Sequence, residues 1–200
     1  MKPSIDFWFS IGSTYTYLSV MRLPEIVRTT GIRFVPRPFS VRAIMREMDN
    51  IPFANKPAKA TYMWRDIERR AARHGFKPRL PAPYPLKEFD RANRVAMVAA
   101  REGWCVAYLA ATYRRWMEDG EEAGSEPNLT ASIAESGQTP SLVIERAETD
   151  EIERAYLAAT DEARRLGIFG SPTFVVDGEL FWGDDRLEDA ITWRESGNLR

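Results

Sequence analysis

The stretch from Gly167 to Asp185, GIFGSPTFVVDGELFWGDD, constrains the fold of this chain more than any other. Thr173 to Val176 is β-branched and aromatic, and Glu179 to Trp182 has apolar residues at alternate positions; both patterns are typical of strands. Asp177-Gly178 between them is a two-residue turn signal, because Gly and Asp both tolerate a positive φ. The stretch therefore predicts an antiparallel hairpin.

Pro172 stands immediately before the first strand of this hairpin. A trans proline there would simply begin the strand, whereas a cis Ser171-Pro172 bond would turn the chain sharply and leave the Ser171 backbone facing outward. Such a backbone edge can pair with an extended peptide. After the hairpin, Gly183 ends the second strand and Asp184-Asp185 opens a helical run. In this hairpin-then-helix context we predict a cis bond.

The N-terminal part of the chain predicts a strand–helix–strand unit. Ser4 to Ser10 alternates apolar and polar residues, a helical pattern follows Ser13, and Ile32 to Phe39 has the composition of a second strand. A connection of this length makes the two strands parallel, as in a βαβ unit. Pro24 inside the helical pattern is expected to kink the helix or divide it in two.

The segment from Val41 to Leu166 is predicted to be almost entirely helical. Asn55 and Pro57 signal the start of a helix that ends at His74-Gly75, and a Pro-rich loop follows it. Four more helices are predicted, each closed by a glycine: Asp90–Glu102, Trp104–Asp119, Leu129–Glu135 and Asp150–Leu166. We therefore predict a helical insertion domain over residues 41–166, between the two parts of an α/β domain at 1–40 and 167–200.

Composition and net charge argue against several classes of protein. The net charge of −1 leaves no electrostatic footprint for nucleic acid. No apolar run reaches the ~18 residues of a membrane span, and the N-terminus lacks the apolar region of a signal peptide. The single cysteine, Cys105, excludes an intrachain disulfide. These features suit a cytoplasmic protein, and neither a nucleic acid nor a membrane is expected as a partner.

Motifs at both ends resemble one family. The cis-proline, hairpin and closing helix resemble the C-terminal half of the thioredoxin fold. GIFGSPTFVVDGELFWGDDRL is similar to the G-x-F-G-x-P-T-F…F-W-G-x-D-R-L signature of 2-hydroxychromene-2-carboxylate isomerases, relatives of kappa-class glutathione transferases. DFWFSIGSTYTYL resembles the D-F-x-x-D-x-x-S-P-x-x-Y-L motif of the same family, with Ser10 in place of an acidic residue and Thr14 in place of proline. The resemblance implies an α/β, thioredoxin-like fold with a large all-helical insertion, and a homodimer.

Ser13 lies where the first strand turns into the first helix. In disulfide oxidoreductases of this fold that turn holds C-x-x-C, but here it holds Ser-Thr-Tyr-Thr, which excludes dithiol–disulfide exchange. The resemblance makes Ser13 the catalytic serine; its alternative role is a helix N-cap. A Ser–His–Asp triad is poorly supported, because His74 is the only histidine and has the sequence context of a helix C-terminus. We interpret Ser13 as a hydroxyl donor to the thiolate of bound glutathione.

The resemblance also implies the rest of a glutathione site. Ser171 and Pro172 would hold the cysteinyl part through the Ser171 backbone, and Asp184 and Asp185 would meet the γ-glutamyl end. Alternatively, one or both aspartates cap the last helix.

Substrate or glutathione contacts are assigned to Asn50 and Lys59, although Asn55 or Lys56 could take those roles. Trp8, Trp64 and Trp182 are candidates for an aromatic pocket or for the core. No metal is expected, and Cys105 is interpreted as an inert buried thiol.

The implied reaction is the isomerisation of 2-hydroxychromene-2-carboxylate to trans-o-hydroxybenzylidenepyruvate in the degradation of aromatic compounds. A thiolate that adds to the conjugated carbon turns a double bond into a single bond, which can rotate before elimination. Two alternatives remain: a kappa-like glutathione transferase that releases the adduct, and a non-catalytic module that binds glutathione or peptides along the Ser171 edge.

Overall fold

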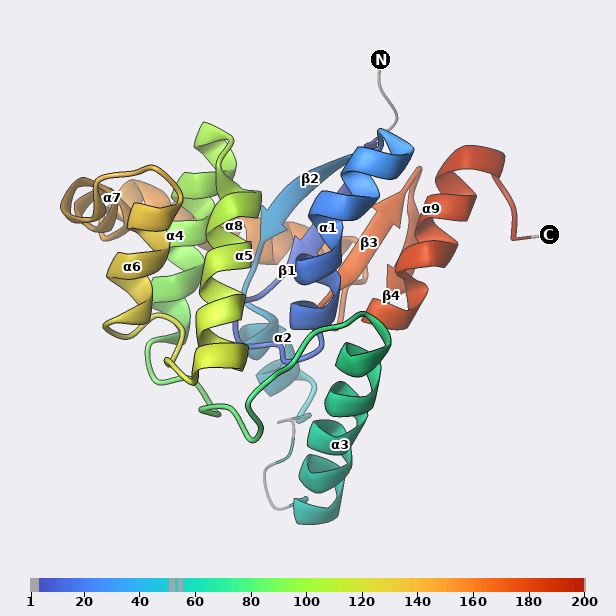
Figure 1. Ribbon diagram of the computed structural model, residues 1–200. Coiled ribbons are helices and arrows are strands. Elements are labelled where there is room, and N and C mark those ends of the chain that lie inside the picture. The colour runs from blue at the N-terminus through green and yellow to red at the C-terminus, as the bar shows by residue number, and fades with distance from the viewer. Residues whose placement is uncertain (1–3, 51–52, 54–55, 200) are drawn as a thin grey trace.

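A computed structural model describes residues 4–50, 53 and 56–199 of the chain (Figure 1). The strands are β1 (Ser4–Phe9), β2 (Arg33–Pro38), β3 (Thr173–Val176) and β4 (Glu179–Trp182). The helices are α1 (Thr16–Thr30), α2 (Val41–Glu47), α3 (Pro57–Arg73), α4 (Phe89–Glu102), α5 (Cys105–Arg114), α6 (Asn128–Glu135), α7 (Pro140–Ala147), α8 (Asp150–Arg165) and α9 (Leu187–Ser196). A π-helical turn (Arg115–Asp119) extends α5, and a 3₁₀ turn (Asp184–Arg186) precedes α9.

The four strands form one mixed sheet in the order β2-β1-β3-β4. β1 and β2 are parallel, whereas β1–β3 and β3–β4 are antiparallel. This confirms the predicted βαβ unit, the hairpin and the final helix, and with them the α/β, thioredoxin-like fold with a large helical insertion. Between β2 and β3, every regular element in the described residues is helical. The division into two domains stays a prediction.

The prolines of β2 explain its place at the edge of the sheet. Pro36 and Pro38 pair with Phe7 and Phe9 of β1, and neither proline has an N–H group to donate. A strand with two such residues is tolerated where one of its sides needs no partner. β2 accordingly has only β1 as its neighbour in the sheet.

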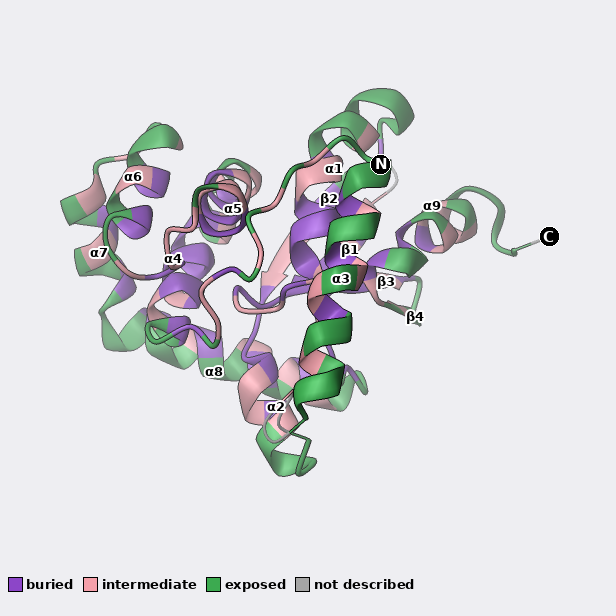
Figure 2. Ribbon diagram, turned by 60° about the horizontal axis from the view of Figure 1, so that its bottom comes forward, coloured by how far each residue is buried: buried purple, intermediate pink, exposed green. Residues whose placement is uncertain are grey.

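Both faces of β1 are buried, which the alternating sequence pattern did not predict. Phe7 and Trp8 point to opposite faces, yet their side chains are 0% and 1% exposed. On one face Phe7 stacks on Phe174 of β3 with ring centroids 5.4 Å apart, and α9 packs on β1 and β3. α4 and α8 pack on β2. In Figure 2 most of β1 accordingly has the buried colour.

One of the two alternatives for the first helix is wrong, and two short helices had no predicted bounds. Pro24 does not divide the first helix, because α1 runs unbroken from Thr16 to Thr30. Packing of its buried face, which includes Leu18 and Leu23, outweighs the loss of one backbone donor. α2 and α7 had no bounds predicted within the helical segment, because each has only seven or eight residues and so shows little periodicity.

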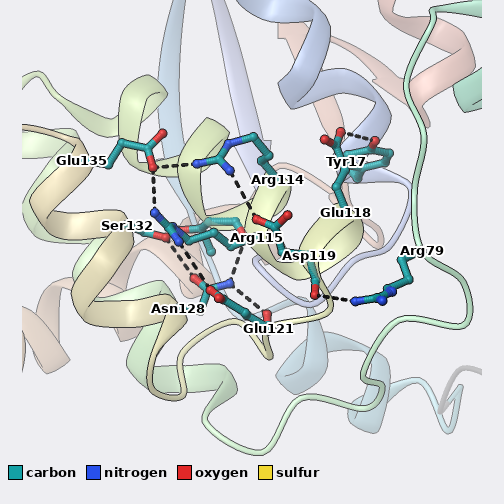
Figure 3. Close-up of polar contacts among 11 residues, drawn as sticks. Tyr17, Arg79, Arg114, Arg115, Glu118, Asp119, Glu121, Asn128, Ser132 and Glu135 are labelled. Carbon is teal, nitrogen blue, oxygen red and sulfur yellow. Dashed lines mark hydrogen bonds and ion pairs between the residues drawn. The ribbon is translucent and has the colours of Figure 1, made fainter.

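A hydrogen bond joins α1 to the helical insertion, beside a polar network within the insertion (Figure 3). Tyr17 of α1 donates to Glu118 in the π-helical turn at 2.8 Å. Arg114 and Arg115 both donate to Glu135 of α6, at 2.6 and 3.0 Å. The start of α1 is therefore anchored in the insertion as well as in the sheet. None of the described helices combines the length and apolar character needed to cross a bilayer.

Candidate functional site

The turn between β1 and α1 is held by buried side chains of the helical insertion. Asn93 of α4 accepts a hydrogen bond from the Ile11 N–H at 2.8 Å and donates to the Ile11 carbonyl at 2.9 Å. The Tyr113 hydroxyl of α5 donates to the Ser13 carbonyl at 3.2 Å. Gly12 adopts φ +123°, and a Cβ there would lie 2.6 Å from the Phe89 ring. The backbone that presents Ser13 is therefore fixed.

The Ser13 side chain faces Ser171 rather than its own helix. Its hydroxyl donates to the Ser171 carbonyl at 2.6 Å. α1 begins at Thr16, and its N-cap residue is Tyr15, whose side chain makes no capping bond. Ser13 therefore does not cap α1. Its hydroxyl instead links two segments that are 158 residues apart in the chain.

Ser171 is held from two further directions. Its Oγ accepts from the Ser10 N–H at 2.9 Å and lies 3.0 Å from Thr16 Oγ1. The Ser171-Pro172 bond is cis, as predicted. Ser13, Thr16 and Ser171 therefore form a compact group of hydroxyls at the strand–helix turn, and Thr16 is a member that the sequence analysis missed.

Asp184 is buried in an internal network instead of standing at an open helix end. Its carboxylate accepts from Ser19 at 2.9 Å and from Arg70 of α3 at 2.7 Å. Arg22 lies 3.7 Å away on its other side. Burial raises the pKa of Asp184, against the opposing effect of these two guanidinium groups.

Asp185, by contrast, is exposed and pairs with Arg186 at 3.2 Å. Gly183 precedes the 3₁₀ turn and Arg186 precedes α9, and neither position provides a side-chain cap. The alternative interpretation of the two aspartates as helix caps is therefore not supported. The two aspartates differ instead in exposure: the Asp184 carboxylate is buried among hydrogen-bond partners, whereas the Asp185 carboxylate is exposed to solvent.

One face of α3 lies along this region. Met63 receives a hydrogen bond from Thr14 at 3.1 Å, and Asp66 receives one from Tyr15 at 3.1 Å. Arg70 contacts Asp184, as described above. Lys59 precedes Met63 by four residues and thus lies on the same face of the helix. Its Nζ is 5.9 Å from the Phe53 ring centroid.

Among the described residues, no hydrogen bond or ion pair joins the other predicted contacts to the Ser13 group. Asn50 is exposed beyond α2, where its N–H donates to the Met45 carbonyl at 2.8 Å. Lys56 is exposed just before α3, and Asn55 lies outside the described residues. The choice between Asn50 and Asn55, and between Lys56 and Lys59, stays a prediction, with the helix face favouring Lys59.

The three candidate tryptophans lie in different surroundings. Trp8 packs edge-on against Phe39 at 6.0 Å. Trp64 packs against Tyr84 at 6.0 Å, and Trp182, half exposed, against Phe169 at 4.8 Å. Among the ring contacts of the described residues, none joins two of these tryptophans. The three rings are therefore not in direct contact, and a shared aromatic pocket stays a prediction.

His74 and Cys105 lie away from Ser13. The His74 Nε2 is 3.2 Å from an Arg22 nitrogen, and no contact within the described part of the chain joins it to Ser13. Burial and the Arg22 charge lower the pKa of His74. Cys105 is buried, and burial raises the pKa of its thiol. Among the described residues, neither His74 nor Cys105 therefore contacts Ser13.

Residues 4–190 match the model of the DSBA-like thioredoxin domain. The chain belongs to this family. A 2-hydroxychromene-2-carboxylate isomerase from Sphingobium xenophagum is 27% identical over 190 residues, covering 94% of this chain and 96% of that protein. Glutathione S-transferase kappa 1 from Caenorhabditis elegans is 24% identical over 209 positions, covering 92% and 88%. A solved 2-hydroxychromene-2-carboxylate isomerase structure has a TM-score of 0.84 at 22% identity, covering 94% and 93% of the two chains.

In this DSBA-like thioredoxin domain, two departures from the motif of the isomerases are explained by packing. Ser10 is fully buried, and its Oγ accepts from the Val41 N–H at 3.4 Å. An acidic side chain would place a charge in this interior position. Thr14 donates to the Met63 sulfur, which links the turn to α3.

Proposed function

We propose that this chain is a glutathione-dependent isomerase that interconverts 2-hydroxychromene-2-carboxylate and trans-o-hydroxybenzylidenepyruvate in aromatic compound degradation. The observation that carries the proposal is the Ser13 hydroxyl, held 2.6 Å from the Ser171 carbonyl at the strand–helix turn. The site has a fixed hydroxyl donor and a backbone acceptor but no thiol, so it suits a ligand that brings its own sulfur. The isomerase and kappa-class relatives support the same assignment.

Glutathione fits these residues through an exchange of donors at the Ser171 carbonyl. The cysteinyl N–H of the tripeptide would replace Ser13 as the donor to this oxygen, as an added strand does. The Ser13 hydroxyl would then be released to donate to the sulfur. A hydroxyl donor at the start of α1 favours the thiolate over the thiol, whose ordinary pKa is about 8.5.

The γ-glutamyl end would lie toward Asp184 and Asp185. Ser19, which contacts Asp184, follows Thr16 by three residues, about 4.5 Å along α1. The γ-glutamyl link runs through the side-chain carboxyl and so places the charged end of the ligand farther along than the ~3.5 Å rise of an α-linked residue, which suits a group beyond the first turn of α1. Because Asp184 already has two arginine partners, we assign it to orienting Arg70 toward the ligand carboxylate. Exposed Asp185 would receive the ligand ammonium.

Bound glutathione would supply a thiolate that adds reversibly to the conjugated carbon of the substrate, so that the bond can rotate before elimination. The protein orients the reactants and stabilises negative charge. Ser13 favours the ionised sulfur, and the Ser171 backbone fixes the position of the cysteinyl group. Lys59, on the face of α3 that contacts Thr14 and Tyr15, would meet the substrate carboxylate, with Asn50 as a further predicted contact.

The decisive test follows the conversion of purified 2-hydroxychromene-2-carboxylate by absorbance. We expect turnover with glutathione and none with S-methylglutathione, which keeps the peptide but lacks the thiol. S-methylglutathione should instead inhibit competitively with respect to glutathione. Turnover in the absence of any thiol would contradict the proposal.

A kappa-like glutathione transferase is the second candidate, supported by the kappa-class relative. The two activities differ in the fate of the adduct. A transferase offered a simple aromatic electrophile should accumulate a stable conjugate, detectable by mass spectrometry, whereas an isomerase should return free glutathione. A non-catalytic module would be retained on immobilised glutathione and released by free glutathione, yet would convert neither substrate.

We expect Cys105→Ala to leave glutathione-dependent turnover within about threefold of wild type. Its thiol is 1% exposed and lies 3.7 Å from the Ala96 carbonyl, inside the insertion. A buried thiol with a raised pKa is a poor nucleophile. Steady-state rates of the variant and wild type provide the comparison, and complete loss in a folded variant would show that a protein thiol participates.

The predicted homodimer and cytoplasmic location belong to the same proposal. Sedimentation at micromolar concentration should give a mass of about twice 22.9 kDa.

A further inference from the structure

A second cavity lies along the edge strand of the sheet, separate from the Ser13 region. It has a volume of about 600 Å³ and is lined by β2 on one side and by α4, α5 and α8 on the other. This size is typical of pockets for small organic molecules. Neither Ser13, Ser171 nor Asp184 lines it. Nothing in the proposed isomerase reaction uses this cavity.

The cavity wall contains a buried donor without a partner. Trp8 is 1% exposed and lines the cavity. Its indole Nε1 has no hydrogen-bond partner in the part of the chain that the structure describes. Buried N–H groups nearly always have an acceptor, so this one is available to an acceptor that enters the cavity.

Arginines line the same cavity as this donor. Arg37 of β2 is paired in register with Trp8 of β1, so the two side chains are neighbours on one face of the sheet. The Arg37 Nε also lacks a hydrogen-bond partner among the described residues and lies 3.6 Å from an Asp6 oxygen. Arg33, Arg101 and a single acid, Glu162, complete the charged part of the wall. Arg37 and Arg101 already have acidic neighbours, Asp6 at 3.6 Å and Glu151 at 2.6 Å, so Arg33 is the lining arginine without an ion pair among the described residues. Together with the unpartnered Arg37 Nε, it favours an anion.

The remaining wall is apolar. Met97 of α4, Val106 of α5 and Ala159 of α8 face the strand across the cavity. A simple inorganic anion would leave this surface uncovered, whereas a neutral hydrocarbon would leave the indole N–H and the guanidinium unmatched. The lining is therefore complementary to a molecule with both parts.

We propose that this cavity binds a small organic acid with an apolar body. Its carboxylate accepts hydrogen bonds from Trp8 Nε1 and from Arg37. Its body packs on Met97, Val106 and Ala159. This site is independent of the proposed isomerase activity, and binding here requires neither glutathione nor Ser13.

The indole N–H signals of ¹⁵N-labelled protein provide a local test. The chain has six tryptophans, and Trp8→Phe identifies the Trp8 signal by its loss. With 2-naphthoate as the probe, we expect a saturable shift of the Trp8 signal, with no effect of Ser13→Ala. The neutral analogue 2-naphthalenemethanol should bind at least tenfold more weakly, because it lacks the charge that Arg37 meets.

Two variants test the site without relying on Trp8→Phe, which alters a buried residue. Arg37→Gln should weaken 2-naphthoate binding roughly tenfold or more, and Ala159→Phe should abolish it by filling the cavity. Arg194→Gln, on α9, is the matched control and should bind as wild type does. An unshifted Trp8 signal at millimolar probe, equal binding of the neutral analogue, or an unaffected Arg37→Gln variant would each overturn the proposal.

Discussion

Ser13→Ala is expected to lower glutathione-dependent turnover about 10²–10³-fold, because a preorganised donor to a developing anion contributes that much to a rate. The substitution removes one hydroxyl and little volume. Its hydrogen bond to the half-buried Ser171 carbonyl is lost, which should reduce the free energy of unfolding by only about 1 kcal/mol. Affinity for glutathione should fall less than the rate, because Ser171, Asp184 and Asp185 are unchanged.

The pH dependence of the variant distinguishes the possible roles of Ser13. Without its donor, the thiol of bound glutathione should have a higher pKa, closer to its free value of roughly 8.5. The rate of Ser13→Ala should then rise with pH toward that value and recover in part. A covalent serine nucleophile would give no such recovery, and its wild-type reaction would proceed without glutathione.

Ser132→Ala is the matched control for this experiment. Ser132 is also a partnered hydroxyl, and it donates to Asn128 within α6 and lies in the network of Figure 3, in the helical insertion. Its pH–rate profile should follow that of wild type. An unchanged profile for Ser13→Ala as well would reduce Ser13 to a structural hydroxyl.

Asp184→Ala is expected to lower the free energy of unfolding by about 3–5 kcal/mol, the range for removing one partner of a buried ion pair. The carboxylate is 1% exposed, and its loss would leave Arg70 and Arg22 without their shared acceptor. Urea denaturation measures the effect. Asp185→Ala is the adjacent control, and because Asp185 is exposed it should change stability by less than about 0.5 kcal/mol.

A double variant separates the ion pair from simple loss of packing. Asp184→Ala alone leaves the Arg70 charge without its partner. Adding Arg70→Met removes that charge as well. Part of the lost stability should therefore return. Two results would show that the carboxylate does not organise this network. One is an Asp184→Ala variant as stable as wild type, and the other is a double variant that loses as much stability as the two single variants added together, or more.

The elements at both ends of the chain could be predicted because their signals are local. Alternating apolar residues in β1 and the Asp-Gly turn between β3 and β4 express backbone preferences of a few adjacent residues, and the structure has these elements within one or two residues of their predicted bounds. The position of Ser13 at a strand–helix turn follows from the same local patterns. The cis Ser171-Pro172 bond followed from the order of hairpin and helix.

What only the tertiary structure decided are contacts between segments far apart in the chain. Ser13 and Ser171 are separated by 158 positions and Arg70 and Asp184 by 114. Periodicity tells which side of a helix is apolar but not which partner covers it. The sequence therefore predicts Asp184 at an open helix start, whereas in the structure Arg70 of α3 covers it. The same holds for Trp8. Its position in a strand follows from the local sequence, but its burial and its unpartnered N–H depend on the helices beside β2. Local sequence biases the backbone of each segment, whereas burial and pairing depend on the packing of all segments together.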